Sequence, residues 1–284
     1  MNLYTRNFSF PQRGLKYFLK AANSLGIANK KYKKKLDDNF YMLLKPTEHI
    51  QQQLFWYGYY EKELGILLKR LVKANDVFLD IGANIGYFSL LAAAVSSSSR
   101  VISFEPVHKL FQELNANISI NNIKNIMPVN AAVGEINEEK EIFLSAPDNL
   151  GMSSFQEPEN YSGKKEKVTV IAIDDWFKTS GLTKIDIIKL DVEGSELAAL
   201  KGMHEVLQKQ GPALIIEINP DTLSMFSLTP FDICHYLNQL NFDGFIIGEN
   251  GGLQGLYQNE IKKTMNVLFI HHEKLTAYSA LFNT

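Results

Sequence analysis

Three acidic residues and a glycine fall within the eight residues KLDVEGSE, at positions 189–196. An apolar run, IDII, directly precedes them, so we expect a buried strand to end where the acids begin. Carboxylates in such a place act as a general base, bind a divalent ion, or form the acidic first turn of the next helix. From this segment alone, all three roles are open for Asp191, Glu193 and Glu196.

A second segment, LDIGANIGYF at 79–88, has the composition of a turn between a strand and a helix, where backbone N–H groups face a ligand. It is not a P-loop, because no lysine follows Gly86. It departs from the dinucleotide fingerprint, because Asn84 replaces the middle glycine. Asp80 at the strand end repels phosphate and attracts a cation, which favours S-adenosylmethionine as the ligand. Glu105 ends the next predicted strand, where a carboxylate suits the two ribose hydroxyls.

The elements that must position these residues alternate along the chain. Short apolar runs are each followed by a segment with helical periodicity, which predicts a parallel sheet covered on both faces by helices. The last two apolar runs have no convincing helix between them and predict an antiparallel pair. The predicted strands of this sheet are 77–80, 100–105, 126–134, 186–192, 213–219, 242–249 and 265–272.

Composition narrows the class of protein. The 284 residues are 45% hydrophobic, which is ordinary for a globular chain with a sizeable core. No apolar run reaches the length of a membrane span, and the first residues lack the apolar region of a secretory signal, so we expect a cytoplasmic protein. Cys234 is the only cysteine, which excludes an internal disulfide and metal sites built on thiolates. No zinc-finger or RNA-binding signature is present, so we expect no nucleic-acid partner.

The charge is unevenly distributed. Residues 1–50 hold 10 Lys and Arg against 3 Asp and Glu, although the whole chain has a net charge of −2. The cluster KKYKKK at 30–35 is either a solvated basic stretch or a weak contact for an anionic surface. We expect residues 1–57 to form a basic, mainly helical N-terminal segment. Residues 58–284 then form the main domain, with an insertion around 135–173.

Seven motifs of this sequence occur together, and in this order, in one known family. The chain resembles the FkbM family over about residues 58–271, whose members are S-adenosylmethionine-dependent methyltransferases typically linked to O-methylation of sugars or secondary metabolites. The resemblance implies an α/β, Rossmann-like class I methyltransferase fold: seven mostly parallel strands in the order 3-2-1-4-5-7-6, with helices on both faces and a helical N-terminal extension. The motifs are DIGANIGY (80–87), FEP (104–106), NAAVG (130–134), IDDW (173–176), IIKLDVEGSE (187–196), LKG (200–202) and IIEI (215–218).

The resemblance also implies a cofactor site. Glu105 would hold the ribose of S-adenosylmethionine, and the stretch that ends at Ala132 would flank its adenine. Glu61 resembles a family position near the cofactor, and the loop GMSS at 151–154 resembles a family segment that we expect to cover the site. The residues expected to cradle the methionine part are Asp80, Gly82, Asn84 and Gly86.

Methyl transfer to an alcohol benefits from a base that accepts the hydroxyl proton. Asp191 is the first candidate, Glu193 the second, and Glu217, at the end of the fifth strand, the third. Lys189 points to the same face of its strand as Asp191 and is expected to pair with it. We expect Glu196 to begin a helix, and we do not expect a metal, because Asp191 and Glu193 alone supply too few ligands.

Two other functions remain possible from the sequence. A NAD-dependent oxidoreductase is disfavoured because the Gly-x-Gly of its fingerprint is absent and Asp80 opposes a pyrophosphate. A non-catalytic binding module on a methyltransferase fold is disfavoured because Asp80, Glu105 and Asp191 are all intact. The predicted partner is a small-molecule or glycan acceptor.

Overall fold

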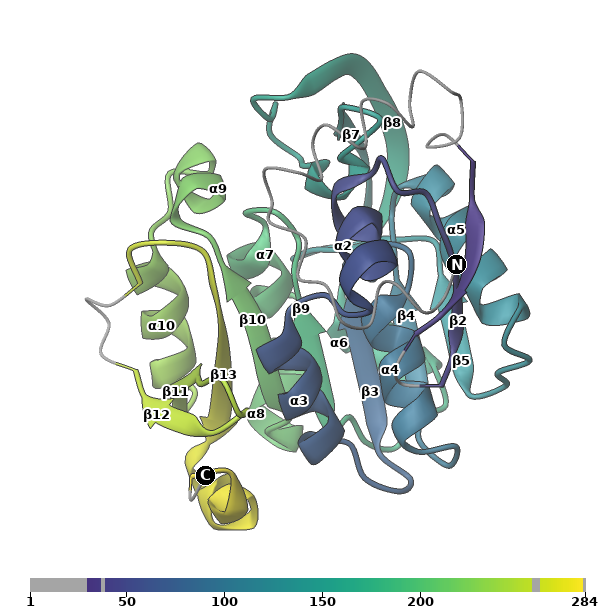
Figure 1. The fold of residues 1–284 in the computed structure, drawn as a ribbon. Coiled ribbons are helices and arrows are strands. Elements are labelled where there is room, and N and C mark those ends of the chain that lie inside the picture. Colours follow the sequence, from purple (N-terminus) through teal and green to yellow (C-terminus); the bar gives the residue numbers. More distant parts are fainter. Residues whose placement is uncertain (1–29, 37–38, 257–260, 283–284) are drawn as a thin grey trace.

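The computed structural model describes residues 30–36, 39–256 and 261–282. At its centre lies an eight-stranded sheet in the order β12-β11-β13-β10-β9-β3-β4-β5 (Figure 1). Five neighbours, from β10 to β5, run parallel, and β13 runs antiparallel to both β10 and β11. The strands are β3 (Val77–Ile81), β4 (Arg100–Phe104), β5 (Ile126–Val129), β9 (Ile187–Leu190), β10 (Ala213–Ile218), β11 (Phe242–Ile247), β12 (Leu253–Gly255) and β13 (Met265–His271).

The seven predicted strands, numbered along the chain, lie in the order 3-2-1-4-5-7-6 across this sheet. The eighth strand, β12, was not predicted, and it pairs antiparallel with β11 at the edge. It has only three residues and follows a glycine-rich turn, so no alternation of apolar residues marks it in the sequence.

Two hydrophobic cores lie on the two faces of the sheet. Neighbouring residues of one strand belong to different cores: Phe78 packs with the helices of one face and Leu79 with those of the other. No helix in the described part of the chain is long and apolar enough to cross a membrane. The first face carries α3 (Lys62–Leu71), α4 (Tyr87–Val95) and α5 (His108–Ser119); the second carries α6 (Ile173–Thr179), α7 (Glu196–Lys201), α8 (His204–Gln210), α9 (Pro220–Met225) and α10 (Pro230–Gln239). A 3-10 helix (His272–Leu281) follows β13.

The described part of the N-terminal segment contains a hairpin that the sequence did not predict. Its strands, β1 (Tyr32–Lys35) and β2 (Tyr41–Leu44), pair antiparallel, and α2 (His49–Tyr57) follows them. Two asparagines hold the free edge of β2: the side-chain oxygens of Asn117, in α5, and Asn121, just after this helix, accept backbone N–H groups of that strand. Residues 1–29 of the segment that we expect to be mainly helical lie outside the described residues.

The basic cluster at 30–35 makes contacts within the molecule. Lys31 Nζ lies 2.8 Å from a carboxylate oxygen of Glu113 on α5. Lys34 donates to the carbonyl of Phe55, and the ammonium of Lys33 lies 4.5 Å from the ring centre of Tyr41. These contacts involve three of the five lysines of the cluster, and a contact with an anionic surface stays a prediction.

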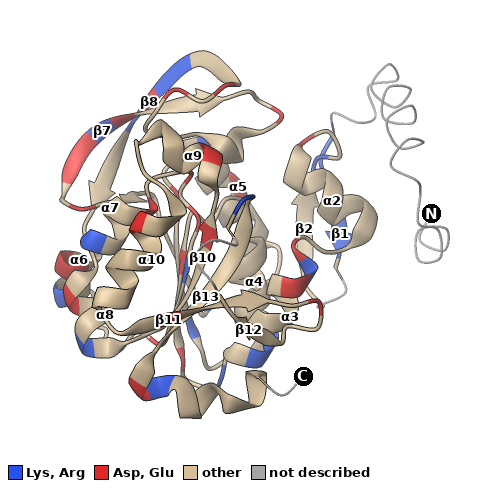
Figure 2. Cartoon of the chain, turned by 90° about the vertical axis from the view of Figure 1, so that its left-hand side faces the viewer, with Lys and Arg blue, Asp and Glu red and all other residues tan. Residues whose placement is uncertain are grey.

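The predicted insertion is a long ribbon that projects beyond the carboxyl ends of the parallel strands (Figures 1 and 2). Strand β8 (Tyr161–Ile171) lies between β6 (Ala132–Val133) and β7 (Glu138–Ser145) in a separate three-stranded sheet. The loop from β7 to β8 contains a 3-10 helix, Leu150–Met152, and folds back toward the main sheet. We call residues 146–155 the lid, because they cover the cavity described next.

Candidate active site

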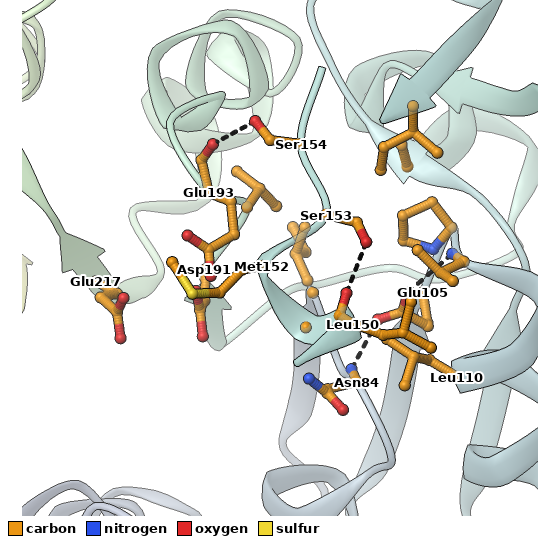
Figure 3. A pocket seen from close by; sticks show the side chains of 18 of the residues that line it. Asn84, Glu105, Leu110, Leu150, Met152, Ser153, Ser154, Asp191, Glu193 and Glu217 are labelled. Atoms are coloured by element: carbon orange, nitrogen blue, oxygen red, sulfur yellow. Dashed lines mark hydrogen bonds between the residues drawn. The ribbon is translucent and has the colours of Figure 1, made fainter. Parts of the chain in front are cut away.

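A cavity of about 440 Å³ lies where the parallel strands end, at the edge of the sheet where open α/β folds bind ligands. Residues at the carboxyl ends of β3, β4, β9 and β10 form its floor, and the lid and the start of α2 complete its wall. Figure 3 shows two groups of polar side chains in it: Asn84 and Glu105 on one side, and Asp191, Glu193 and Glu217 on the other. We call these sides the Glu105 end and the acid end.

The turn after β3 forms part of the Glu105 end. Gly82 has a φ of +81°, which L-residues with a side chain rarely adopt. An added Cβ at this position would overlap the carbonyl oxygen of Asp191, so glycine is needed for the close approach of the β3 turn to the β9 turn. The backbone N–H groups of Gly82 and Ala83 both donate to the carbonyl of Phe104, at 3.0 and 2.9 Å, which fixes the turn on β4.

Glu105 lies against this turn and is only 4% exposed. One of its carboxylate oxygens accepts the N–H of Asn84 at 2.8 Å, and the other accepts the N–H of Val107 at 2.9 Å. Burial raises the pKa of Glu105 to about 7, although the two amide bonds oppose the shift. The carboxyl group therefore joins the turn after β3 to the segment that enters α5, and it also faces the cavity.

Of the seven residues predicted to bind the cofactor, five line the cavity and two do not. Asp80 is 1% exposed and lies beneath the turn, where it accepts the Ser89 hydroxyl at 2.5 Å. Gly86 has its φ at +89° and faces Leu114, so it serves helix packing. Asp80 and Gly86 support the turn from behind, and their direct contact with the cofactor stays a prediction. The lining residues are Glu61, Gly82, Asn84, Glu105 and Ala132.

At the acid end, Asp191 forms an ion pair with Lys189. The distance from Lys189 Nζ to Asp191 Oδ2 is 2.9 Å, and the lysine side chain is only 3% exposed. Burial lowers the pKa of Lys189, but the nearby carboxylates of Asp191, Asp80 and Glu61 outweigh it and raise that pKa above its ordinary value. Lys189 therefore stays charged, and its ion pair orients the carboxylate of Asp191. The pairing agrees with the expectation that both side chains point to the same face of the strand.

The other carboxyl groups of the acid end bind protons more strongly than exposed ones do. Burial raises the pKa of Glu193 to about 8, and the charges of Asp191 and Glu196 add to this effect. The charge of Asp191, followed by burial, raises the pKa of Glu217 to about 10. Burial also raises the pKa of Glu61, against the charge of Lys189. The negative charge of Asp191 therefore contributes to the raised pKa values of Glu193 and Glu217.

Glu196 begins α7, in the place expected for an acid that meets the helix dipole. It also has a second role, because its Oε1 accepts the N–H groups of Val192 and Gly194 at 3.3 and 3.1 Å. Burial raises its pKa to about 7. Glu196 thus closes the turn that presents Asp191 and Glu193, and it does not line the cavity.

The lid is attached to both sides of the cavity. The Ser154 hydroxyl donates to the carbonyl of Glu193 at 2.8 Å, and the backbone N–H of His49 on α2 donates to the carbonyl of Asp148 at 3.1 Å. An added Cβ at Gly151 would overlap the side-chain nitrogen of Asn84. Residues 151–154 all line the cavity, as expected for a segment that covers the site.

Several lining residues were not predicted. Asn219 follows Glu217 at the spacing of one strand face, so reasoning from strand ends could have found it. Tyr60 lies between α2 and α3, and its only signal was its place next to Glu61. His49 and Thr264 had no such signal, because tertiary packing alone brings them to the cavity. The described residues contain no group of three or more His, Cys, Asp or Glu side chains able to hold a metal ion.

Comparisons with known proteins agree with this architecture. Residues 80–243, more than half of the chain, match the family model of the methyltransferase FkbM domain. The hexuronic acid methyltransferase AglP of Haloferax volcanii is 27% identical over 56% of this chain and 62% of its own length. The 31-O-demethyl-FK506 methyltransferase FkbM of Streptomyces tacrolimicus is 26% identical over 47% of this chain and 62% of its own length. The chain thus spans less than two thirds of either relative.

Among solved structures, a methyltransferase FkbM from Methylobacillus flagellatus KT is similar, at 19% identity and a TM-score of 0.46 over 69% of this chain and 44% of that one. The family-model match covers the turn after β3, Glu105, the lid and the acids of β9 and β10. The chain therefore belongs to the FkbM family of methyltransferases.

Proposed function

We propose that the protein transfers a methyl group from S-adenosylmethionine to a hydroxyl group of a sugar, glycan or secondary metabolite. One observation carries the proposal. Asp191, held by Lys189 at the carboxyl end of β9, lies in the same cavity as Glu105, at the opposite side (Figure 3). This arrangement supplies a base on one side and a binding site for a nucleoside on the other.

The chain's own residues fit S-adenosylmethionine. Apolar side chains around Ala132, among them Phe104, Leu110 and Ile142, suit an adenine ring beside the carboxyl group of Glu105. Oxygen Oε2 of Glu61 is buried in the structure without a hydrogen-bond partner among the described residues, which suits the ammonium of the methionine part. No Lys or Arg is among the described residues that line the cavity, so a pyrophosphate would meet no counter-charge, and NAD is disfavoured.

Bound S-adenosylmethionine supplies a methyl group that is activated by the attached sulfonium. The protein aligns the acceptor hydroxyl and receives its proton, and alignment accounts for a large part of the rate in such displacements. We assign proton acceptance to Asp191, with Glu193 and Glu217 as the alternatives. Lys189 orients the Asp191 carboxylate, and the lid keeps water from the reacting groups.

The names of relatives support the acceptor class. AglP is named as a methyltransferase of hexuronic acid, and FkbM as a methyltransferase of 31-O-demethyl-FK506. We therefore expect a hydroxyl-bearing small molecule or glycan, and no nucleic acid.

Titration calorimetry with S-adenosylmethionine and with NAD tests the cofactor. We expect micromolar binding of S-adenosylmethionine and no measurable binding of NAD; the reverse result would refute the proposal. Mass spectrometry of metabolites and glycans from the native host, with and without the gene, tests catalysis. We expect a product heavier by one methylene group only when the gene is present. Tight cofactor binding without any such product would favour the binding-module alternative.

A further inference from the structure

We propose that Tyr60 and Glu61 together bind the amino-acid end of S-adenosylmethionine, with the Tyr60 hydroxyl donating to the carboxylate and Glu61 accepting from the ammonium. The inference rests on the proposed function and deepens it, because it assigns the recognition of this end of the cofactor to residues that precede the family-model match. It follows from the hydrogen bonds of the turn after β3, from the other donors of the cavity wall, and from the conformation of the chain at residues 60–61.

The turn after β3 has no free backbone N–H for a carboxylate. All five N–H groups of residues 82–86 have acceptors within the protein, at distances from 2.8 to 3.0 Å. Two donate to the carbonyl of Phe104, one to Glu105, one to the side chain of Asn84 and one to the carbonyl of Ala83. Turns at the start of a helix often bind anions through such groups. Here the carboxylate of the cofactor needs a donor from another part of the cavity.

The hydroxyl groups of the lid are committed as well. The Ser153 hydroxyl donates to the carbonyl of Leu150 at 2.7 Å, and the Ser154 hydroxyl donates to that of Glu193 at 2.8 Å. Thr264 lines the cavity as an exposed residue, where water competes for its hydrogen bonds. No Lys or Arg is among the described lining residues, so the donor must be a neutral group or a histidine.

The remaining ring and amide donors of the described wall are placed for other contacts. His49 is an exposed residue of α2. The amide of Asn84 lies at the Glu105 end, where its nitrogen approaches Gly151 of the lid (Figure 3). The side chain of Asn219 caps α9, because its oxygen accepts the N–H of Asp221 at 3.0 Å. Tyr60 is the lining donor that lies next to Glu61 in the chain.

Tyr60 lies at the acid end with its hydroxyl available. Its ring contacts Phe88, with 6.3 Å between the ring centres, and the ammonium that pairs with Asp191, Lys189 Nζ, lies 5.2 Å from the centre of the same Phe88 ring. No hydrogen bond joins the Tyr60 hydroxyl to another residue of the described structure. Burial, and then the charge of Glu61, raise the pKa of this hydroxyl above its ordinary range, so it keeps its proton and donates.

The backbone at Glu61 allows two neighbouring side chains to reach the cavity. Consecutive residues of an extended segment point to opposite sides, yet Tyr60 and Glu61 both line the cavity. Glu61 has a φ of 43° and a ψ of 68°, a left-handed conformation that costs free energy in a residue with a side chain. The hydroxyl of Tyr60 thus accompanies the buried Glu61 Oε2, which has no partner in the described structure. The ammonium and carboxylate of an amino acid share one carbon atom, so adjacent residues suit them.

Two ligands that differ by one carboxylate test the assignment. Decarboxylated S-adenosylmethionine keeps the adenosine, the sulfonium and the amino group of the cofactor. Affinities of the full-length protein and of Tyr60→Phe for both ligands are measured by titration calorimetry. Phenylalanine keeps the ring beside Phe88 and removes the hydroxyl, so we expect the affinity for S-adenosylmethionine to fall at least ~10-fold and that for the decarboxylated ligand to change less than ~2-fold. Comparison of the two losses cancels the difference in net charge between the ligands.

Tyr59→Phe is the matched control. Tyr59 is 43% exposed and does not line the cavity, so both affinities should stay as in the unmodified protein. Equal losses for the two ligands in Tyr60→Phe would mean that the hydroxyl does not act on the carboxylate. An unchanged affinity for S-adenosylmethionine in that variant would mean that the carboxylate is bound elsewhere. Either result overturns the inference.

Glu61→Gln tests the other half of the assignment. Both ligands carry the ammonium, so we expect this variant to bind each of them at least ~10-fold more weakly. In contrast, 5′-methylthioadenosine lacks the whole amino-acid end and should bind Tyr60→Phe, Glu61→Gln and the unmodified protein within ~2-fold, which shows that the cavity of the variants is intact. Unchanged affinities in Glu61→Gln contradict the role of this carboxylate.

The two levels of the proposal fail differently. Lack of binding of S-adenosylmethionine by the unmodified protein would count against the proposed cofactor. Normal binding of S-adenosylmethionine that does not depend on the Tyr60 hydroxyl would count against this inference alone.

Discussion

At the scale of single residues, the site depends on a buried charge pair. Lys189 is surrounded by protein, yet it remains charged because Asp191 lies 2.9 Å away and Asp80 lies opposite it in the pairing of β3 with β9. A buried ion pair adds little to stability, but breaking one partner is costly, so such pairs fix geometry. Here the pair fixes the orientation of the carboxylate that we assign as the base.

Replacing Asp191 by Asn tests this role. Asparagine has the same shape and still accepts a hydrogen bond from Lys189, but it does not take up a proton, so we expect turnover to fall at least ~100-fold. Cofactor affinity should stay within a few-fold, as measured by calorimetry beside a methyl-transfer assay. Asp175→Asn, at an exposed position of α6, is the control. Unchanged turnover in Asp191→Asn would transfer the role to Glu193 or Glu217.

Gly82→Ala tests the close approach of two turns. The new methyl group would overlap the Asp191 carbonyl, and the φ of +81° disfavours any side chain, so both turns would have to move. We expect the free energy of unfolding to drop by about 2–4 kcal/mol and cofactor binding to be lost. Chemical denaturation and calorimetry measure the two effects. Gly255→Ala, whose added Cβ has open space, should change neither; an unaltered Gly82→Ala protein would show that the approach is not required.

At the scale of elements, three segments far apart in the sequence close the cavity. The first is the lid, which belongs to the β7–β8 insertion. The second is the turn after β9, which carries Asp191 and Glu193. The third is α2, which precedes the residues that match the family model. The lid bonds to both α2 and the β9 turn, so it links the N-terminal segment to the reacting groups.

Gly151→Ala is expected to loosen the lid without unfolding the protein. Its added Cβ would press on the Asn84 side chain, which is held because its oxygen accepts the N–H of Ile85 at 2.8 Å. The lid must then shift outward, and we expect a ~5–10-fold weaker affinity for S-adenosylhomocysteine with a change in unfolding free energy below ~0.5 kcal/mol. Calorimetry and denaturation report the two quantities. A large loss of stability, or an unaltered affinity, would contradict this account of the lid.

The elements also show why part of the structure was predictable. Strands such as VFLDI are apolar except for one acid near the end, because both faces are buried, and that pattern can be recognised without tertiary information. The β1–β2 hairpin could not be recognised, since Asn117 of α5 and Asn121 just after it, 74 and 80 residues away, accept the N–H groups at its edge.

The site was predictable to the same extent. Strand ends and the glycine turn indicated Asn84, Glu105 and Asp191, because ligands bind at that edge of such sheets. Asp80 does not line the cavity, because its side chain accepts the Ser89 hydroxyl beneath the turn, and its contact with the cofactor stays a prediction. Thr264 was missed because it directly precedes β13, and only the packing of that strand brings it to the cavity.

At the scale of the whole molecule, buried acids make stability depend on pH. Burial raises the pKa values of Glu105 and Glu196 to about 7 and that of Glu193 to about 8, all above the usual 4.5 of glutamate. Between about pH 4.5 and 8 the folded protein therefore binds more protons than the unfolded chain does. We expect these three groups to make stability fall as the pH rises through this window, which is the reverse of the effect of acids whose pKa a salt bridge lowers.

We expect the thermal midpoint of the free protein to be higher at about pH 5.5 than at about pH 8.5. Glu196→Gln isolates one contribution, because glutamine still accepts the N–H groups of Val192 and Gly194 but has no proton to lose. This variant should show a smaller fall between the two pH values, whereas Glu205→Gln, at an exposed acid whose pKa is lowered by Lys209, should not. A midpoint that rises with pH in the unmodified protein would mean that these carboxyl groups are ionised when buried, and the proton-holding acid end would then lose its basis.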